Sequence, residues 1–366
     1  MSHFTNVVGG VFKFSDGHEM PKVGLGISRI ETQEALDVSV EAALKSGYRL
    51  FDTANLYKNE LFLGISLKKY LPVFGLTRED VFITTKVRTL NENTVEEVEK
   101  QLANSLATLQ TDYIDLLLVH YPRDRDTGND DDYEVNKSRR KIVWQTLEKA
   151  KDSGKLRSIG VSNYEVYHLV EMFQYAKHRP VLNQYEYQPY LTRPTLKKYC
   201  DLNNIVVQSY SSLCWGDQNI LQEDIIIQLC QKYNQTPQAI LYAFAYCSNT
   251  SMIPKSATPS RIHDNLHNTI KIQLTDEDLK SLRALDKGKS FLPIGQTWRS
   301  FRSRGNWVRF REYLAPMLSP IEGIESLVLI KIIFLTSTPV DSRIKRILGR
   351  RGAYHLDDRI VLFEKL

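Results

Sequence analysis

The chain has 366 residues, of which 42% are hydrophobic and 25% charged, a balance that excludes a collagen-like, an intrinsically disordered or a membrane-embedded chain. The formal net charge of +5 is unevenly distributed, because residues 292–366 hold 13 Lys and Arg against 7 Asp and Glu, whereas residues 1–291 hold 35 against 36. We therefore expect a nearly neutral main domain followed by a basic segment of different character.

The predicted elements begin with a hairpin. Two short runs, residues 11–14 and 19–21, flank Ser15-Asp16-Gly17-His18, in which Asp-Gly is a strong turn signal. Eight short β-branched or apolar runs typical of strands follow, at residues 23–26, 49–53, 81–86, 113–120, 157–162, 181–184, 205–210 and 251–254. The segments between them have the apolar spacing of helices, at residues 32–46, 59–70, 94–109, 139–153, 164–178, 193–202, 224–233 with 237–245, and 260–266.

Short strands that alternate with helices over about 250 residues are typical of a (β/α)8 TIM barrel. The alternative is a doubly wound open sheet, which would need a glycine fingerprint directly after its first strand. Gly24 and Gly26 supply only two of the three glycines, and no helix begins directly after them. We therefore predict an α/β protein with an N-terminal β-hairpin and a barrel over residues 1–292, and an irregular, poorly ordered extension over residues 293–366.

The cysteines and the apolar runs exclude several further classes. The four cysteines contain no CxxC pair, which argues against a zinc site, an iron-sulfur cluster or a redox dithiol. The first residues lack the basic start and the long apolar run of a secretory signal. The apolar run at residues 327–335 is far shorter than the ~20 residues that a membrane-crossing helix needs. We expect reduced thiols, no membrane partner and a cytosolic, cytoplasmic location.

Polar side chains follow the predicted strands at the end where such a barrel places its functional residues. They are Asp52, Lys86, His120, Ser162, Asn163, Gln184, Tyr210 and Lys255. Each alone has a structural explanation, since Asp52 could cap a turn, Lys86 could be solvated and His120 could be a hydrogen-bonded core residue. Their occurrence at successive strand ends instead favours a functional site.

Six separated segments resemble the signature segments of the aldo-keto reductases, in the order and at the spacings of that family. They read YRLFDTANLYKNE from residue 48, ITTK from 83, DLLLVH from 115, GVSN from 160, NQYE from 183 and IPKS from 253. The resemblance covers about residues 11–292. It implies a (β/α)8 barrel and an NADP-dependent oxidoreductase of the alcohol dehydrogenase or aldehyde reductase type.

The resemblance also implies a catalytic role for four residues. Tyr57 would be the general acid, giving its proton to a carbonyl oxygen while a hydride arrives from NADPH. A free tyrosine has a pKa of about 10, and Lys86 beside its hydroxyl would favour the phenolate and ease release of the proton. Asp52 would hold Lys86 by an ion pair, and His120 would orient the substrate carbonyl. This chemistry requires neither a covalent intermediate nor a metal.

The cofactor site that the resemblance implies is NADPH/NADP+. The residues expected to hold it are Ser162, Asn163, Gln184, Tyr210, Ser211, Lys255, Ser256, Arg261 and Asn265. Thr258 is a candidate N-cap, with Pro259 at the first helical position, so backbone donors and nearby cations would converge on the adenosine 2′-phosphate. This favours NADPH over NADH.

The substrate pocket is the part that departs from the family pattern. Ser28 stands where many members have an aromatic residue, Tyr121 where tryptophan is frequent, and Gln188 where histidine is usual. We expect Ser28, Tyr121 and Trp215 to line a pocket for a small carbonyl substrate. Residues 123–140 correspond to a specificity loop and are predicted to be mobile.

The basic segment leaves alternatives open. Residues 292–307 could form a loop over the pocket, with Trp298, Phe301 or Trp307 lining it. A basic run can also bind nucleic acid, but a disordered extension that the barrel can dispense with is the simpler interpretation. A second function class is an NADPH-binding regulatory or structural barrel with little activity, which the complete catalytic set argues against. We expect a monomer with no nucleic-acid partner.

Overall fold

A computed structural model describes residue 4 and residues 7–89, 94–123 and 133–291. The predictions for residues 293–366, including Trp298, Phe301 and Trp307, and for residues 124–132 of the specificity loop lie outside the described residues.

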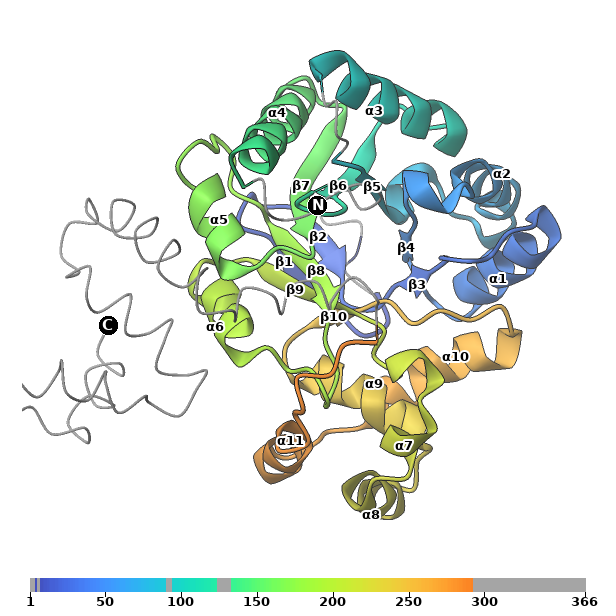
Figure 1. The fold of residues 1–366 in the computed structure, drawn as a ribbon. Helices are drawn as coiled ribbons and strands as arrows, with labels where there is room; N and C mark the ends of the chain where they lie inside the picture. The colour runs from blue at the N-terminus through green and yellow to red at the C-terminus, as the bar shows by residue number, and fades with distance from the viewer. Residues whose placement is uncertain (1–3, 5–6, 90–93, 124–132, 292–366) are drawn as a thin grey trace, which may run out of the picture. The chain divides into compact units, whose positions relative to one another are not determined.

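Eight parallel strands form the centre of the fold, in the order β3 to β10 around a barrel (Figure 1). Their bounds are β3 (Leu25–Gly26), β4 (Leu50–Asp52), β5 (Phe82–Val87), β6 (Ile114–Val119), β7 (Leu156–Ser162), β8 (Leu182–Glu186), β9 (Val206–Tyr210) and β10 (Ser251–Met252). The ring closes where the backbone N–H of Gly24 donates to Met252 O and that of Gly26 to Pro254 O. The predicted barrel and all eight predicted strands are confirmed.

Close packing at the point where the barrel closes explains Gly26 of β3 and Gly24 directly before this strand. A Cβ on Gly26 would lie 2.9 Å from the carbonyl oxygen of Ile253, and one on Gly24 would lie 2.4 Å from Cγ of Leu50. Real Cβ atoms do not approach so closely, so any side chain there would push β3 away from its neighbours. Gly24 and Gly26 are therefore explained by the close packing of the strands where the barrel closes. They need not belong to a glycine-rich dinucleotide-binding motif.

The helices surround the strands (Figure 1). Their bounds are α1 (Gln33–Lys45), α2 (Glu60–Tyr70), α3 (Val95–Leu109), α4 (Tyr133–Asp152), α5 (Val166–Met172), α6 (Pro194–Leu202), α7 (Gln218–Leu221), α8 (Asp224–Tyr233), α9 (Pro237–Cys247), α10 (Pro259–His267) and α11 (Asp276–Arg283). Among the described residues, no helix combines the length and apolarity needed to cross a membrane.

Two helix predictions differ from the structure in their bounds, and two helices, the short α7 and α11, were not predicted. Helix α4 begins before residue 139, in a polar segment whose Val135 is 39% exposed, so it carries no apolar stripe that could be recognised. Helix α5 ends at Met172 instead of residue 178, because Gln174 and Tyr175 donate to carbonyls three residues back and tighten the chain into turns. Helix α11 was not predicted, although Thr275 and Asp278 form a capping box.

The hairpin closes the amino-terminal end of the barrel. Strands β1 (Val11–Lys13) and β2 (Glu19–Pro21) pair antiparallel, as the Asp-Gly turn predicts. Phe14 and Met20 are buried in one cluster with Leu50 and Phe82 from the first residues of β4 and β5. The rings of Phe14 and Phe82 meet edge to face, with centroids 6.3 Å apart. Apolar side chains thus fill the interior at this end, whereas the strand-end residues expected to be functional lie at the carboxyl ends of the strands.

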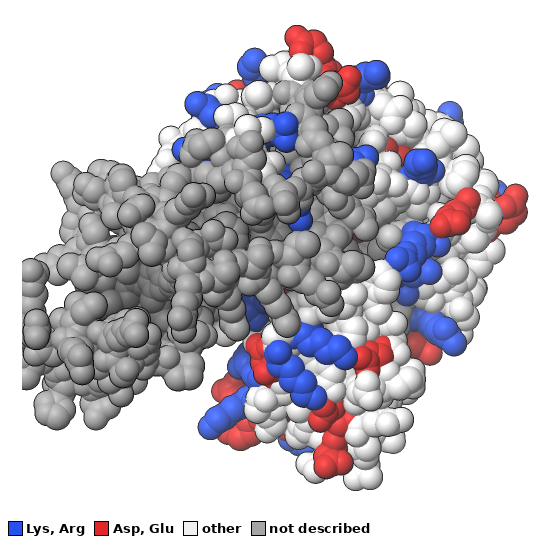
Figure 2. All heavy atoms as spheres, viewed as in Figure 1, with Lys and Arg blue, Asp and Glu red and all other residues white. Residues whose placement is uncertain are grey.

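The described surface carries charges of both signs. In Figure 2, Lys and Arg side chains are interspersed with Asp and Glu over the described part of the face in view. This agrees with the near balance of 35 basic and 36 acidic residues over positions 1–291.

Candidate active site

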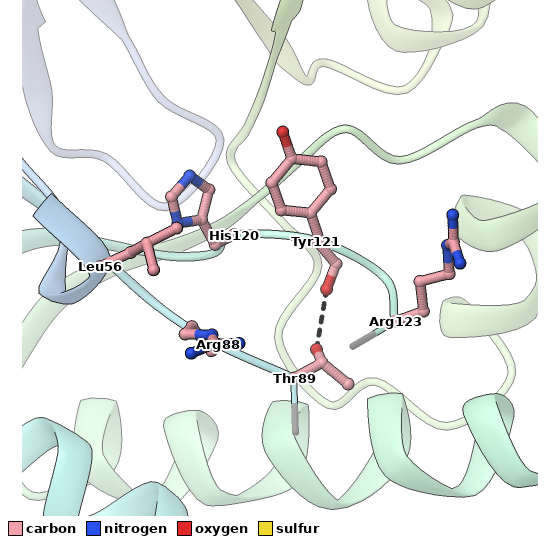
Figure 3. Close-up of a pocket in the computed structure, with 6 residues that line it drawn as sticks. All are labelled: Leu56, Arg88, Thr89, His120, Tyr121 and Arg123. Atoms are coloured by element: carbon pink, nitrogen blue, oxygen red, sulfur yellow. Dashed lines mark hydrogen bonds between the residues drawn. The ribbon is translucent and has the colours of Figure 1, made fainter. Parts of the chain in front are cut away.

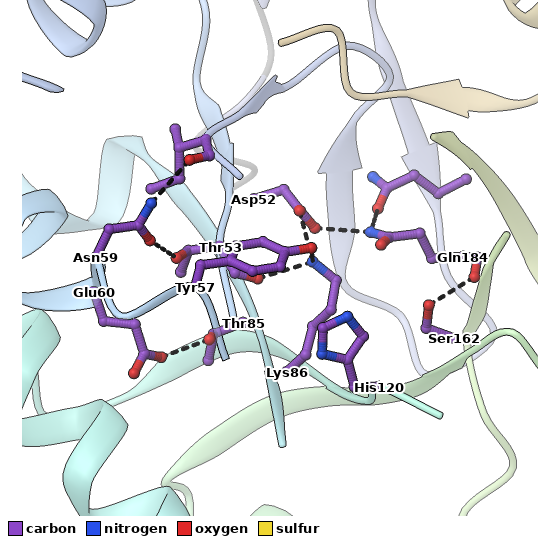
Figure 4. A network of polar contacts seen from close by, with 12 residues as sticks. Asp52, Thr53, Tyr57, Asn59, Glu60, Thr85, Lys86, His120, Ser162 and Gln184 are labelled. Atoms are coloured by element: carbon purple, nitrogen blue, oxygen red, sulfur yellow. Dashed lines mark hydrogen bonds and ion pairs between the residues drawn. The ribbon is translucent and has the colours of Figure 1, made fainter. Parts of the chain in front are cut away.

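The four predicted catalytic residues meet at the carboxyl ends of β4, β5 and β6 (Figure 4). Lys86 is fully buried and donates through Nζ to Asp52 Oδ1 at 2.6 Å and to the Thr53 carbonyl oxygen at 2.8 Å. The Tyr57 hydroxyl accepts from the same Nζ at 3.4 Å. Asp52 is only 2% exposed, so this ion pair lies in a low-dielectric site where charge interactions are strong.

The pKa of Tyr57 differs from the sequence-based expectation of a net lowering. Burial raises the pKa of the phenol above its usual value, and the Lys86 ammonium offsets only part of that increase. A hydrogen-bonding contribution from Ser28 also lowers this pKa. For Lys86, burial acts to lower the pKa, but the Asp52 carboxylate and Tyr57 outweigh it, so the pKa lies above its usual value. The site therefore holds a neutral phenol beside an ammonium.

Tyr57 lies on a short 3-10 turn, η1 (Asn55–Tyr57), that a buried amide holds in place. The Asn59 Nδ2 donates to the carbonyl oxygens of Ile27 at 2.8 Å and Ile30 at 3.0 Å, while its Oδ1 accepts from Thr53 Oγ1 at 2.8 Å. The turn is thereby tied to the loop after β3. Sequence reasoning missed this role, because the two carbonyl groups to which Asn59 donates belong to residues about 30 positions away in the chain.

His120 faces Tyr57 from the end of β6. The two rings meet edge to face with centroids 5.7 Å apart, and the His120 ring also stacks on Tyr121 with centroids 5.2 Å apart. The His120 backbone is fixed on both sides, since its N–H donates to Val87 O at 2.8 Å and its carbonyl accepts from Asn163 Nδ2 at 3.0 Å. A substrate oxygen between the two rings would thus meet a phenol and an imidazole.

A polar chain extends from Asp52 across the barrel interior (Figure 4). Gln184 Nε2 donates to Asp52 Oδ2 at 2.7 Å and to Gln208 Oε1 at 2.6 Å. Gln208 Nε2 in turn donates to Ser251 Oγ at 3.0 Å. Both carboxylate oxygens of Asp52 are therefore engaged, one by Lys86 and one by Gln184. Sequence reasoning missed Gln208, although it lies within a predicted strand.

The predicted nicotinamide residues also lie together. Ser162 Oγ donates to the Gln184 carbonyl at 2.8 Å, and Asn163 Nδ2 donates to Ser162 Oγ at 2.9 Å. The Tyr210 hydroxyl donates to Asn163 Oδ1 at 2.5 Å. Asn163 has a φ of 62°, a left-handed conformation that asparagine tolerates better than most residues. The strand ends of β7, β8 and β9 thus present one connected polar surface.

Ser211 and Trp215 lie in the loop after β9. Trp215 Nε1 donates to Ser211 Oγ at 2.9 Å, and the Arg29 guanidinium lies 4.4 Å from the centroid of the Trp215 ring. This cation–π contact joins the loop after β9 to the loop after β3 across the mouth of the barrel. Trp215 remains 50% exposed.

The predicted phosphate site lies at the start of α10. Thr258 is the N-cap and Pro259 the first helical residue, as predicted, but the Thr258 side chain makes no capping hydrogen bond. Instead the Thr258 N–H donates to Ser256 Oγ at 3.0 Å. The remaining residues expected there are the exposed Lys255 and Arg261 and the half-buried Asn265. The uncapped first turn beside two cations is a suitable place for an anion.

A hollow of about 210 Å³, which includes open solvent, lies beside His120 (Figure 3). Its lining consists of Leu56, Arg88, Thr89, His120, Tyr121 and Arg123. Of the predicted substrate residues, this lining contains Tyr121 but neither Ser28 nor Trp215. The sequence carried no signal for Arg88 and Arg123, because only the parallel pairing of β5 and β6 brings their segments together.

Burial raises the pKa of all four cysteine thiols, which disfavours the reactive thiolate. The cysteines Cys200, Cys214, Cys230 and Cys247 are free thiols, and burial raises the pKa of Cys200 to about 12. Among the residues that the structure describes, no group of three or more His, Cys, Asp or Glu could hold a metal ion.

Comparison with known proteins gives the class to which this fold and site belong. The model of the Aldo/keto reductase family matches residues 10–287. The chain therefore belongs to the aldo/keto reductase family, whose members are oxidoreductases that act on carbonyl compounds.

Individual relatives agree with this assignment. The chain is 36% identical over 284 residues to the glyoxal reductase of Bacillus subtilis (strain 168), a match that covers 77% of this chain and 94% of the relative. It is 34% identical over 292 residues to the methylglyoxal reductase DkgA of Yersinia pestis, covering 80% and 98%. Among solved structures, MGS-M4, an aldo-keto reductase from a Medee basin deep-sea metagenome library, superposes with a TM-score of 0.68 at 31% identity, covering 77% and 96%.

Proposed function

We propose that the protein is an NADPH-dependent reductase that converts aldehydes or ketones to alcohols, with Tyr57 as the general acid. The observation that carries the proposal is the position of Lys86 Nζ, 2.6 Å from Asp52 Oδ1 and 3.4 Å from the Tyr57 hydroxyl, beside the His120 ring. This set of groups can donate a proton and stabilise the anion that remains, which is what carbonyl reduction requires of the protein.

The reaction balances without a further reagent. Bound NADPH would supply the hydride, and with it the electron pair that reduces the carbonyl carbon. The Tyr57 O–H bond breaks as its proton passes to the carbonyl oxygen, which becomes the alcohol. The phenolate left behind is stabilised by the Lys86 ammonium, which Asp52 keeps charged. His120 orients the carbonyl by a hydrogen bond, and solvent returns a proton to Tyr57.

The residues present fit NADPH as the cofactor. Ser162, Asn163 and Gln184 offer hydroxyl and amide groups at adjoining strand ends, suited to the nicotinamide carboxamide, and Tyr210 offers a ring for stacking. The start of α10 offers Ser256 and Asn265 with the exposed charges of Lys255 and Arg261, which suit a 2′-phosphate that NADH lacks. Ser211 lies directly after Tyr210 and is placed among the cofactor contacts on that ground.

The first test is consumption of NADPH with a panel of carbonyls, followed by the absorbance of the reduced nicotinamide. Glyoxal and methylglyoxal head the panel, because the relatives are reductases of these compounds. Tyr57→Phe should abolish turnover and leave NADPH binding, measured by quenching of tryptophan fluorescence, nearly unchanged. Tight NADPH binding without turnover of any carbonyl would contradict the proposal and favour the regulatory or structural barrel.

The expectations about assembly, location and the basic segment stay predictions. We propose that the protein acts as a monomer in the cytosol and that residues 1–292 form the catalytic unit. Sedimentation of the full chain tests whether the protein is a monomer. Deletion of residues 316–366 tests whether residues 1–292 form the catalytic unit, and a large loss of NADPH affinity or of turnover would contradict that proposal.

A further inference from the structure

Glu60 is a buried carboxylic acid beside the predicted catalytic residues that the proposed reaction does not use (Figure 4). It is 4% exposed and lies in the first turn of α2, three residues after Tyr57. Within the described part of the chain its hydrogen-bond partners are neutral groups, from Thr85, Asn55 and Thr108. Acidic side chains are almost never fully buried unless they are paired with a cation. Glu60 therefore needs an explanation beyond packing.

The shortest contact of Glu60 is with strand β5. Thr85 Oγ1 donates to Glu60 Oε1 at 2.6 Å, the length expected of a hydroxyl that donates to a carboxylate. Thr85 is fully buried and directly precedes Lys86. Because side chains alternate along a strand, Thr85 faces the helices while Lys86 faces Asp52 in the barrel interior. Glu60 thus holds from the helix side the strand that Asp52 holds from the inside.

Two longer contacts join Glu60 to neighbouring elements. Asn55 Nδ2 and Thr108 Oγ1 each lie 3.4 Å from Glu60 Oε2, beyond the usual length of a hydrogen bond. Asn55 is the first residue of the η1 turn that carries Tyr57, and Thr108 belongs to α3. The carboxyl group therefore contacts η1, β5 and α3 at once, and the contact with β5 is the strongest of the three.

The close approach of α2 to α3 brings Glu60 to this position. Gly64 follows Glu60 by four residues and so lies on the same face of α2. A Cβ on Gly64 would lie 2.6 Å from the Thr108 carbonyl oxygen and 2.8 Å from the Leu109 carbonyl oxygen. Only glycine allows α2 to pack so closely against the end of α3. Helix packing therefore helps to place Glu60 next to β5.

The surroundings of Glu60 compensate its burial only in part. Burial raises the pKa of its carboxyl above the usual value, and the hydrogen bond from Thr85 acts against this rise. The N-terminus of α2 adds a partial positive charge, which favours a carboxylate. In either protonation state the carboxyl keeps an oxygen that can accept from Thr85. The contact with the neighbour of Lys86 therefore does not depend on a cation.

We propose that Glu60 is a positioning residue that sets the distance between the Tyr57 hydroxyl and Lys86 Nζ, which is 3.4 Å. Only three positions separate Tyr57 from Glu60, so the hydrogen bond to Thr85 ties the turn of Tyr57 to the strand of Lys86. In the described structure the hydrogen bonds of Glu60 reach none of the four predicted catalytic residues. This inference rests on the proposed function, since it concerns the same proton donor.

The main test is a pair of substitutions at Glu60 in the full chain, assayed with NADPH and the carbonyl of the panel that is reduced fastest. Glu60→Leu removes the acceptor for Thr85, and we expect kcat to fall about tenfold while KM and the NADPH dissociation constant change less than about twofold. Glu60→Gln keeps an oxygen for Thr85 and should retain most of kcat. Glu34→Leu, at an exposed glutamate in the first turn of α1, is the matched control and should leave kcat unchanged.

Thr85→Val assigns the effect to the one short hydrogen bond, because valine has nearly the shape of threonine without its hydroxyl. We expect this variant to lower kcat as Glu60→Leu does, and the double variant to lose no more than either single variant. Losses that multiply in the double variant would mean that the two residues act independently, and would overturn the proposal. Thr85→Val also replaces the main test if Glu60→Leu fails to fold.

Hydrogen exchange gives a readout that does not need turnover. The Tyr57 N–H donates to Ala54 O at 2.9 Å, and the Lys58 N–H donates to Asn55 O at 3.3 Å. In Glu60→Leu these two amides should exchange about tenfold faster than in the wild type, while the amides of α9 keep their wild-type rate. An equal increase in η1 and α9 would show a general loss of stability and would overturn the proposal.

Failure of this inference and failure of the proposed function give different results. If the wild type reduces carbonyls and folded Glu60→Leu keeps its kcat, the inference is overturned and the proposed function stands. An equal loss of kcat in Glu60→Gln and Glu60→Leu would overturn it as well, since glutamine retains the acceptor. If the wild type consumes no NADPH with any carbonyl, the proposed function is contradicted and the inference is withdrawn with it.

Discussion

Gln184 Nε2 and Asp52 Oδ2 are 2.7 Å apart in the barrel interior, although 132 positions separate the two residues in the chain. The other oxygen of Asp52, Oδ1, accepts a hydrogen bond from Lys86 Nζ, so the carboxylate is held from two sides. The orientation of the ammonium next to Tyr57 therefore depends on residues from β4, β5 and β8 together.

Gln208 is expected to position this network without touching the reacting atoms. Gln208→Leu removes the acceptor for Gln184 Nε2 and the donor for Ser251, at a cost of about 1–3 kcal/mol in the free energy of unfolding, measured in urea. If Gln208 acts through Gln184 and Asp52, the alkaline limb of the kcat profile should also move. A loss of stability with an unchanged pH profile would reduce its role to packing.

Removing one partner of the Asp52–Lys86 ion pair should lower the stability of the protein more than replacing both partners with apolar residues. Lys86→Met leaves a buried carboxylate without its cation, and we expect a loss of about 3–5 kcal/mol in stability together with loss of turnover. The double variant Asp52→Leu with Lys86→Met should recover stability but not turnover, because no buried charge remains unpaired. A double variant less stable than Lys86→Met alone would contradict this account.

The pH dependence of reduction follows from the two raised pKa values. Burial raises the pKa of Tyr57, and Asp52 with Tyr57 keeps the pKa of Lys86 above its usual value despite burial. Both groups therefore stay protonated at neutral pH and lose their protons only above about pH 10. We expect kcat for reduction to stay level from neutral pH to that range and to fall beyond it. An alkaline fall centred near pH 8 would contradict the raised pKa of Tyr57.

Substitution of Asn59 is expected to lower both the stability of the fold and the rate of catalysis. Asn59→Leu removes the Asn59 donor from the Ile30 carbonyl oxygen and one of the two donors of the Ile27 carbonyl oxygen, which keeps the Ile30 N–H, and should cost about 1–3 kcal/mol in the free energy of unfolding. Because the turn that carries Tyr57 is loosened, kcat should fall more than KM rises. Asn104→Ala on the exposed face of α3 is the matched control and should change neither quantity.

Arg261 is expected to distinguish the two nicotinamide cofactors. If it contacts the 2′-phosphate, Arg261→Ala should weaken NADPH binding about tenfold and leave NADH binding unchanged, as measured by titration calorimetry. Lys271→Ala, which removes an exposed lysine from the η5 turn (Thr269–Lys271) after α10, is the control. An equal loss for both cofactors would place Arg261 elsewhere than at the phosphate.

Local sequence patterns accounted for most of the fold. The alternation of short apolar runs with amphipathic segments predicted the barrel, and Asp-Gly predicted the hairpin. The misses were the boundaries of α4 and α5 and the presence of α7 and α11. At the start of α4 the polar stretch around Val135 has no apolar stripe, so no local signal marks a helix there.

The sequence by itself located the strand ends, and with them Asp52, Lys86 and His120, whereas Tyr57 and the catalytic roles of all four residues come from the resemblance to the family and stay predictions. Residues at the ends of strands can be located from local periodicity. The sequence did not determine that burial outweighs Lys86 in the pKa of Tyr57, nor that Gln208, Asn59 and Arg88 adjoin the site. These features depend on desolvation and on contacts between distant segments, which exist only once the barrel has closed.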